Sequence, residues 1–397
     1  MTVTFAVLTL SYYVLTADDF ALFNLLVFFF ALGSALAAPL NRAFWAANSP
    51  ENFGPASGAT GAIVCVVVVG GLIFTGPSSS IRLVLAAAGA IYGVAKVLER
   101  YAYGRMLVAG ESAWAVLPAI IFVSVEAGVV AAMWIFKSKS LLLRIIVPAL
   151  LFLTVAALTR LKPLLQDFWR ALRDPRASLE FARSHLISHL GAQVIAIGGL
   201  ATIAGMGERL LIKYLPLATP EASAAYLLVL SYAVAFQTLS SFLFDLSRAR
   251  VFRDGSWQPQ ARRFSLISAG LLVAVIGAAG FAYPLLRFLH VIPDGITQLL
   301  WVALLMRSSC LTLILTLNVD KFQQGTLLSL AVSNVIVLVG AVVSFGLLHE
   351  GFSQLFASLT LIGACCITTA VNGVRFFQRI GSLESEAVGT HEGNPSG

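Results

Sequence analysis

GMGERLLIKYLPLATPEASAAYLLVL, residues 205–230, joins the end of one apolar segment to the start of the next through a short polar joint. The joint carries the adjacent charges Glu208 and Arg209, and then a Thr-Pro-Glu sequence at 219–221. A threonine followed by acidic charge is typical of a helix start, because the hydroxyl caps free backbone N–H groups and the carboxylate offsets the helix dipole. The stretch therefore predicts two consecutive helices, the second beginning just after Thr219.

A similar joint lies near the N-terminus, in SYYVLTADDFALFNLLVFF (residues 11–29). Thr16 aligns with Thr219, acidic residues follow each of them, and an aromatic residue comes about two turns later in both. The two joints lie about half a chain length apart. The sequence therefore favours one helical arrangement that is used twice.

The composition excludes a soluble globular domain. Of 397 residues, 58% are hydrophobic and 11% are charged, whereas a soluble domain carries about 25% charged residues. With a mean hydropathy of +0.89 and long apolar runs that do not alternate, the chain is expected to be a polytopic helical membrane protein. The net charge of +7 is then assigned to cytoplasmic loops rather than to a nucleic-acid partner.

We expect an all-α fold of about twelve transmembrane helices in two parallel, pseudo-repeated six-helix bundles around a central cavity. The predicted apolar segments are 2–16, 20–38, 59–76, 81–98, 113–136, 141–161, 190–207, 223–245, 264–288, 296–317, 325–348 and 352–377. The predicted domains are an N-terminal half at 1–161, a basic cytoplasmic linker at 162–189, a C-terminal half at 190–378 and a disordered cytoplasmic tail at 379–397.

The distribution of basic residues predicts that both termini are cytoplasmic. Far more Lys and Arg residues fall in loops on the side of the termini than on the other side, and the cluster from Lys137 to Arg144 is the local exception. No basic region precedes the first apolar segment, so the sequence does not predict a cleavable signal peptide there. The segment is also short for a span, so we expect an abbreviated first helix or a start further upstream. In the linker, Leu164, Leu165 and Phe168 have helical spacing, which favours a helix lying on the anionic inner leaflet, or alternatively a partner-docking helix.

No enzyme motif is evident. The chain has no P-loop, no nucleophile elbow, no zinc-protease motif and no Cys-x-x-Cys pair. The four cysteines lie inside apolar segments and are interpreted as packing residues, and His185 and His189 have no further ligand near them in the sequence. We therefore predict a protein that is not an enzyme and that needs neither a cofactor nor a metal.

Three stretches resemble bacterial polysaccharide flippases of the multidrug/oligosaccharidyl-lipid/polysaccharide exporter superfamily. TADDFALF (16–23) and ALGSALAAPLNRAFW (31–45) resemble the first two helices of that family, and GERLLIKYLPLATPEASAAYLLVLSYA (207–233) resembles helices seven and eight. In the family an acidic–Arg pair ends helix seven, and an acidic residue and a tyrosine open helix eight. Glu208 stands where the family more often has aspartate.

The resemblance implies a flippase that moves undecaprenyl-pyrophosphate-linked oligosaccharide across the bacterial inner membrane by alternating access, for O-antigen, capsule or exopolysaccharide synthesis. Its expected partners are that lipid-linked glycan, the bilayer, a polysaccharide polymerase and glycosyltransferases. A cation-coupled multidrug antiporter of the same superfamily and a membrane partner of a glycan synthase remain alternatives. An O-antigen polymerase or ligase would need a large outer loop, and the sequence offers none.

Charged residues inside apolar segments are the candidates for function, because such charges are costly in a membrane. Arg307 lies mid-segment and is expected either to bind the diphosphate through paired hydrogen bonds or to form a structural ion pair with a carboxylate of a neighbouring helix, for which Glu126 is a candidate. Glu126 is otherwise a candidate coupling site. Arg42 and Arg209 are further candidates for substrate binding, the latter at the outer mouth.

The remaining candidates lie at helix ends. Adjacent residues on a helix point about 100° apart, so Glu208, a coupling or ion-pair candidate, need not pair with Arg209. Asp245, Arg248 and Lys96 lie at the inner ends of their segments and are expected either to form an inner gate or to anchor the helices at the interface.

Overall fold

The computed structural model describes residues 2–47, 50–75, 79–108, 111–159, 161–173, 175–235, 258–317 and 328–392. In these ranges every regular element is a helix and none is a strand. Seven of these helices are long and apolar enough to cross a membrane, which confirms the all-α class for the described part: α2 (Ala17–Leu36), α4 (Phe53–Thr75), α7 (Leu117–Ile135), α8 (Leu141–Leu158), α11 (His189–Met206), α17 (Leu328–His349) and α18 (Gln354–Glu392).

The other elements are either shorter or more polar. The longer ones are α1 (Thr2–Val14), α5 (Ser79–Val108), the helix Pro220–Ala235, α14 (Gln258–Phe288) and α15 (Gln298–Leu317). The connecting ones are α3 (Ala38–Ala47), η1 (Pro50–Asn52), α6 (Ser112–Ala115), α9 (Lys162–Arg173), α10 (Pro175–Leu186) and α12 (Glu208–Tyr214). Helix α18 continues to Glu392 and so covers most of the segment for which the sequence favours disorder.

Both polar joints form the helix starts that the sequence predicts. The Oγ1 atom of Thr16 accepts a hydrogen bond from the backbone N–H of Asp19 at 3.2 Å, at the start of α2. The Oγ1 atom of Thr219 accepts one from the backbone N–H of Ala222 at 3.1 Å, at the start of the helix Pro220–Ala235. Each cap satisfies a backbone donor that has no partner inside its own helix.

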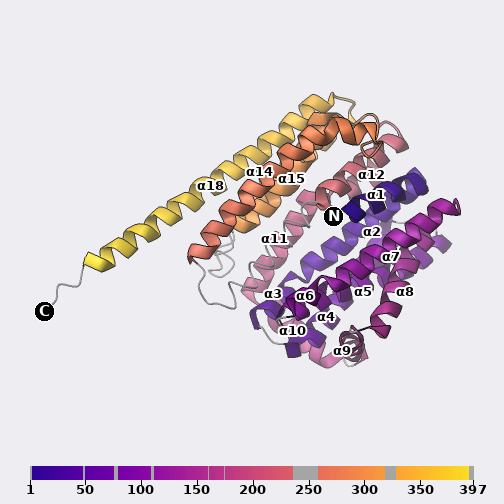
Figure 1. Ribbon diagram of the computed structural model, residues 1–397, viewed down its shortest axis with the longest axis horizontal. Coiled ribbons are helices and arrows are strands. Elements are labelled where there is room, and N and C mark those ends of the chain that lie inside the picture. Colours follow the sequence, from indigo (N-terminus) through magenta and orange to yellow (C-terminus); the bar gives the residue numbers. More distant parts are fainter. Residues whose placement is uncertain are drawn as a thin grey trace.

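The helices gather into an N-terminal half (α1–α8) and a C-terminal half (α11 onwards). Figure 1 shows α1, α2, α4, α5, α7 and α8 on one side and α14, α15 and α18 on the other, with α11 and α12 between them. In the N-terminal half, α4 packs on α5, α5 on α8, α1 on α7 and α7 on α8. In the C-terminal half, α14 packs on α15, α15 on α18, α11 on α17 and α17 on α18. Helix α2 packs against α11 and α12, and so joins the halves.

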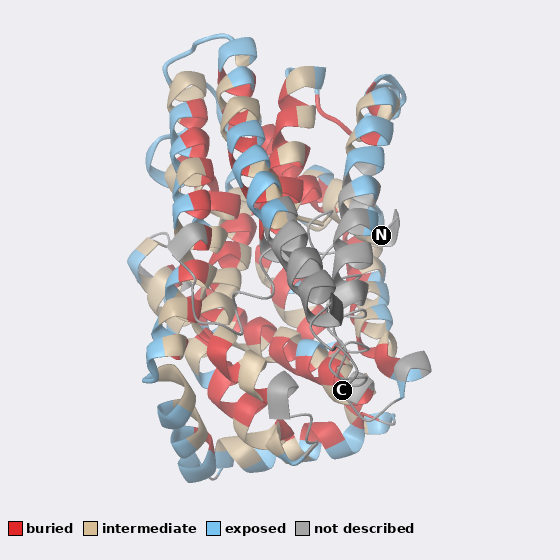
Figure 2. Cartoon of the chain, turned by 90° about the vertical axis from the view of Figure 1, so that its left-hand side faces the viewer, coloured by how far each residue is buried: buried red, intermediate tan, exposed pale blue. Residues whose placement is uncertain are grey.

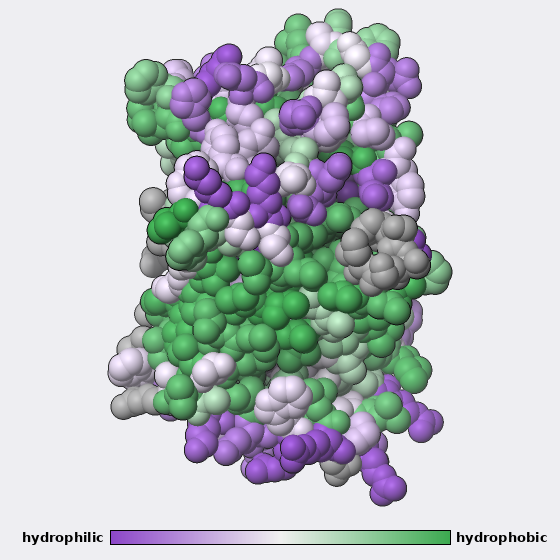
Figure 3. Space-filling view, turned by 90° about the vertical axis from the view of Figure 1, so that its right-hand side faces the viewer, coloured by the Kyte–Doolittle hydropathy of each residue, from purple (hydrophilic) through white to green (hydrophobic). Residues whose placement is uncertain are grey.

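The surface is apolar around the middle of the bundle. On the face in Figure 3 a broad hydrophobic band separates two hydrophilic ends. Figure 2 shows buried residues through the interior and exposed ones mostly at the ends and along the outer faces. Phe74, Leu158 and Phe281 are more than four-fifths exposed, at 86%, 81% and 90%. A soluble protein rarely exposes so much contiguous apolar surface, whereas a bilayer would cover it.

The linker helices α9 and α10 pack on the N-terminal half. The apolar face of α9 lies against α4 and α10 packs on α3 and α4. Phe168 is fully buried, and its ring lies over Gly61 of α4, where an added Cβ would come within 3.2 Å of it. The apolar face that the sequence predicts on the lipid or on a partner therefore contacts the protein itself.

Replacing Gly340 with alanine is expected to destabilise the contact between α17 and α18. A Cβ at this position would lie 2.5 Å from the Cβ of Ala364, and neither atom can move without a shift of backbone. Overpacking of this kind costs about 1–3 kcal/mol. Thermal unfolding of the purified protein in detergent measures the loss.

Gly363 on the facing helix is the matched control. An added Cβ there meets nothing within 4 Å, so Gly363→Ala is expected to be neutral or to stabilise the helix by up to about 1 kcal/mol. Equal melting temperatures for the two variants would contradict the close approach of α17 to α18.

Candidate functional site

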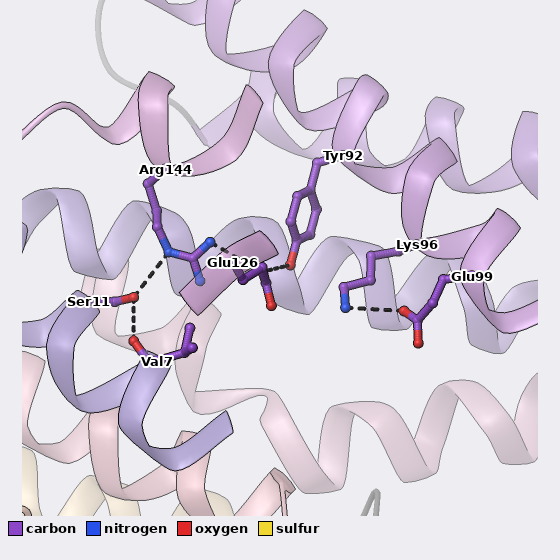
Figure 4. Close-up of polar contacts among 7 residues, drawn as sticks. All are labelled: Val7, Ser11, Tyr92, Lys96, Glu99, Glu126 and Arg144. Carbon is purple, nitrogen blue, oxygen red and sulfur yellow. Dashed lines mark hydrogen bonds and ion pairs between the residues drawn. The ribbon is translucent and has the colours of Figure 1, made fainter. Parts of the chain in front are cut away.

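The N-terminal half encloses a polar cluster built on four helices, which Figure 4 shows in close-up. Glu126 of α7 is buried, and its Oε1 atom accepts hydrogen bonds from Arg144 Nη1 of α8 at 3.2 Å and from Tyr92 Oη of α5 at 3.1 Å. Arg144 Nε donates to Ser11 Oγ of α1 at 3.0 Å, and Ser11 Oγ donates to the carbonyl oxygen of Val7 at 2.7 Å. The cluster therefore ties α1, α5, α7 and α8 together.

A second ion pair continues this cluster along α5. Lys96, one turn after Tyr92, pairs with Glu99 at 3.2 Å, and its Nζ atom lies 3.6 Å from the centre of the Phe122 ring. The guanidinium of Arg144 likewise lies 4.5 Å from the ring centre of Phe23. The two cations of the cluster balance its two carboxylates, so the cluster has no surplus charge with which to attract an ion.

The C-terminal half encloses a different cluster. Glu208 opens α12, and its Oε1 atom accepts hydrogen bonds from Arg307 Nη1 of α15 and from Tyr226 Oη, the latter at 3.3 Å. Arg307 Nη2 also donates to the carbonyl oxygen of Gly205 at 3.2 Å. Glu208 is 2% exposed and Arg307 is 0% exposed, so this pair is closed off from water.

Arg209, the next residue, reaches a different set of partners. Its Nη2 atom donates to Ser231 Oγ at 3.1 Å, and Ser231 Oγ lies 2.8 Å from Asn24 Oδ1 on α2. Asn24 in turn donates from Nδ2 to the carbonyl oxygen of Phe20 at 3.0 Å. Arg209 is thus connected through one serine to the N-terminal half.

This second cluster carries surplus positive charge. Two guanidinium groups, Arg209 and Arg307, face one carboxylate, Glu208. Arg209 is 2% exposed, and among the described residues no atom accepts from its Nε or Nη1 atoms. A buried cation with donors unused costs free energy unless an anion or another acceptor compensates it. The C-terminal cluster is therefore the candidate site for an anionic group.

The structure does not bring the charged residues singled out in the sequence together in one site. Glu126 does not meet Arg307: each pairs within its own half, with Arg144 and with Glu208. Arg42 lies half-buried in α3, where burial lowers its pKa below the usual value. Lys96 pairs with Glu99 rather than with a residue of the other half. Asp245 and Arg248 lie outside the described residues.

Sequence reasoning overlooked part of both clusters. It counted Arg144 only among the basic residues of the outer side, whereas Arg144 lies in the first turn of α8, is 1% exposed and belongs to the N-terminal cluster. Ser140 caps that helix, accepting from the N–H of Leu143, and a serine before three leucines was the available signal. Asn24 and Ser231 were overlooked too, although Asn24 is a polar residue within an apolar run.

In the described ranges no three His, Cys, Asp or Glu side chains are grouped so that they could hold a metal ion. Comparisons of the chain with models of known protein families, with curated proteins and with solved structures found no match.

Replacing Glu126 with glutamine is expected to destabilise the protein by about 1–3 kcal/mol. Glutamine keeps an oxygen that can accept from Tyr92 and Arg144, but it removes the negative charge that balances the buried guanidinium of Arg144. Glu99→Gln is the matched control, because its side chain is more exposed (19%) than that of Glu126 (11%) and its partner Lys96 is exposed too (21%), so that a smaller loss is expected. Equal losses in thermal unfolding for both variants would contradict the enclosed N-terminal cluster.

Proposed function

We propose that the protein is a flippase, which carries undecaprenyl-pyrophosphate-linked oligosaccharide across the bacterial inner membrane for O-antigen, capsule or exopolysaccharide synthesis. The observation that carries this proposal is the surplus positive charge enclosed where α12 meets α2, within a bundle that has an apolar outer band. A lipid-linked diphosphate matches both features: its phosphates suit the buried guanidinium groups, and its polyprenyl chain suits the surrounding lipid.

The packing of the helices supports two parallel repeats. If α1, α4, α5, α7 and α8 correspond to α11, α14, α15, α17 and α18, then four packed pairs of the N-terminal half have counterparts in the C-terminal half. The pairs α4–α5, α5–α8, α1–α7 and α7–α8 match α14–α15, α15–α18, α11–α17 and α17–α18. Two halves of six spans would place both termini on the same side, and the basic loops favour the cytoplasm.

In this proposal the cargo binds between the halves and each half moves largely as a rigid body. Arg209 offers free donors to the diphosphate, and Arg307, held by Glu208, adds its charge to the same site. Arg42 would meet the cargo on the cytoplasmic side, and Lys96, Asp245 and Arg248 would belong to the inner gate. Alternating access then requires that contacts between the halves break and reform on each side in turn.

A cation-coupled multidrug antiporter is the second candidate. The observation that favours it is Glu126, a buried carboxylate held by a tyrosine and an arginine in the N-terminal half. Such a group could exchange its partners for a proton or a cationic drug. The charge balance of that cluster favours the flippase, because an antiporter for cations needs surplus negative charge.

The experiment that tests the proposal is deletion of the gene, followed by extraction of lipid-linked oligosaccharides. The flippase predicts accumulation of undecaprenyl-pyrophosphate glycan that a membrane-impermeant lectin cannot reach in spheroplasts, and its clearance when the wild-type gene is restored. Absence of accumulation together with increased drug sensitivity would favour the antiporter instead. Absence of both would overturn the two transport candidates.

A further inference from the structure

Among the residues that the structure describes, three polar bridges connect the two halves on the side of the polar joints. Each connects α1 or α2 with the C-terminal half. The bridged pairs are Thr9 Oγ1 with Tyr232 Oη at 2.5 Å, Tyr13 Oη with the carbonyl oxygen of His290 at 2.7 Å, and Asn24 Oδ1 with Ser231 Oγ at 2.8 Å. We call them the joint-side bridges.

Only the Asn24–Ser231 bridge is connected to the surplus charge. Ser231 Oγ accepts from Arg209, and its one proton is shared between Asn24 Oδ1 at 2.8 Å and the carbonyl oxygen of Leu227 at 2.7 Å, so the guanidinium and the N-terminal half meet at one hydroxyl group. Arg209 is 2% exposed, which leaves no room for a phosphate to reach it while α2, α12 and the helix Pro220–Ala235 stay packed. Helix α2 of the N-terminal half is one of the helices packed on α12, so parting α2 from the C-terminal half would break the bridge and uncover the unused Nε and Nη1 donors.

We propose that Arg209 is an anion-operated release for the joint-side bridges: a phosphate oxyanion that binds Arg209 stabilises the state in which Asn24 and Ser231 are apart. The inference deepens the proposed function and rests on it only for the identity of the anion, a lipid-linked diphosphate. Each planar fork that a guanidinium presents to an oxyanion includes Nη2, the atom that now bonds Ser231.

Thermodynamic linkage between anion binding and opening predicts which arrangement the anion favours. The closed arrangement holds an under-bonded cation in an apolar interior, and an anion at Arg209 removes that cost only after the halves part. A ligand shifts a conformational equilibrium by the ratio of its affinities for the two states. An anion that cannot reach the closed state therefore favours the open one, and a neutral lipid does not.

The test reports closure at a bridge distant from Arg209. Tyr13→Cys and His290→Cys are combined in a chain without its native cysteines, purified in nanodiscs, and treated with a short bismaleimide crosslinker. Inorganic pyrophosphate is expected to reduce the crosslinked fraction several-fold, whereas chloride at equal ionic strength leaves it unchanged. Undecaprenyl pyrophosphate and undecaprenol, added in parallel, distinguish a lipid-borne diphosphate from a free one.

Variants decide whether Arg209 carries the response. Arg209→Gln is expected to abolish it and Arg209→Lys to weaken it, because lysine supplies a point charge without the planar fork. Lys213→Gln, on the same helix and exposed, is expected to respond like the parent. Asn24→Ala removes the bridge itself and should lower crosslinking even without pyrophosphate, a result that does not depend on Arg209→Gln folding.

The proposal is overturned if pyrophosphate leaves the parent unchanged, or if Arg209→Gln responds as the parent does. It is also overturned if Asn24→Ala crosslinks as the parent does, because the bridge would then contribute nothing to closure. The proposed function fails separately. If pyrophosphate opens the bridges but deletion of the gene accumulates no lipid-linked glycan, the release stands and the cargo is a different anion.

Discussion

Replacing Arg307 with methionine is expected to lower the free energy of unfolding by about 3–5 kcal/mol, because it leaves a buried carboxylate without its cation. Glu208 is 2% exposed and would retain only the hydroxyl of Tyr226 among the partners seen in the structure. The adjacent Arg209 compensates only partly, since its one bonded nitrogen is directed to Ser231. Thermal unfolding in detergent should show the largest loss of any single substitution in the C-terminal cluster.

A double variant shows whether the loss comes from the pair. Arg307→Met combined with Glu208→Leu removes both charges, and replacing a buried ion pair by apolar residues is often neutral or stabilising. We expect the double variant to recover most of the stability, with a double-mutant cycle giving the coupling. If the single variant is as stable as the parent, or if the double variant recovers nothing, the ion pair is not the source of stability.

The same pair of variants separates structure from transport. If the double variant recovers both stability and clearance of lipid-linked glycan, Arg307 serves to hold α15 against α12. If it recovers stability without clearance, the charge of Arg307 is needed by the cargo. The sequence left these two roles open, and the enclosed pair makes them separable, because Glu208 can be removed together with its partner.

Local signals in the sequence were sufficient for the helix starts. The hydroxyl groups of Thr16 and Thr219 each accept from a backbone N–H three residues further on. A cap of this kind can be predicted from the local sequence alone. Apolar runs likewise predicted the seven helices that are long and apolar enough to cross a membrane, because length and hydropathy are local properties, whereas a count of twelve spans stays a prediction. The hydrogen bonds of the candidate site are not local: Glu208 and Arg307 are 99 residues apart, and Asn24 and Ser231 are 207 apart.

The sequence did not predict how each helix is rotated about its own axis, and so which neighbour each charged side chain faces. A helix that is apolar all round gives no preferred face, so Arg307 could have pointed to a cavity, to lipid or to a neighbour. Only packing decides, and it places Arg307 against Glu208 and Glu126 against Arg144. The resemblance to flippases pointed to the joint at Glu208 and Arg209, but it could not show that these neighbours bond to different helices.

The linker shows a second limit of the same kind. An apolar helix face is equally suited to lipid, to a partner or to the protein's own surface, so the spacing of Leu164, Leu165 and Phe168 could not choose between them. The feature that favours the protein's own surface is in α4, where Gly54, Gly58 and Gly61 recur at helical spacing. A Cβ on Gly58 would lie 2.8 Å from Ser178 Oγ, which shows how closely α10 approaches. Small residues at such spacing permit close helix packing.

Phe168→Ala is accordingly expected to release the linker from the N-terminal half. The ring is fully buried over Gly61, and truncation of a buried phenylalanine costs about 3–5 kcal/mol. Because the lost contacts lie between α9 and α4, the loss should appear as local opening before the bundle unfolds. Amide hydrogen exchange across α9 and α10 should therefore rise strongly, while exchange in α7 and α8 stays close to that of the parent.

Trp169→Ala is the matched control, because the adjacent side chain is 44% exposed, whereas Phe168 is fully buried, although the edges of the two rings meet with their centres 6.0 Å apart. This substitution removes a comparable apolar volume. If α9 packs by the Phe168 face only, amide hydrogen exchange in α9 and α10 should change little. If hydrogen exchange in α9 and α10 rose equally in both variants, the linker would also be held by the face that carries Trp169. That result is expected for a helix lying on the lipid surface. Selective loss for Phe168→Ala would instead mean that the linker moves as part of the N-terminal half, so that any rocking between halves must bend the chain after α10.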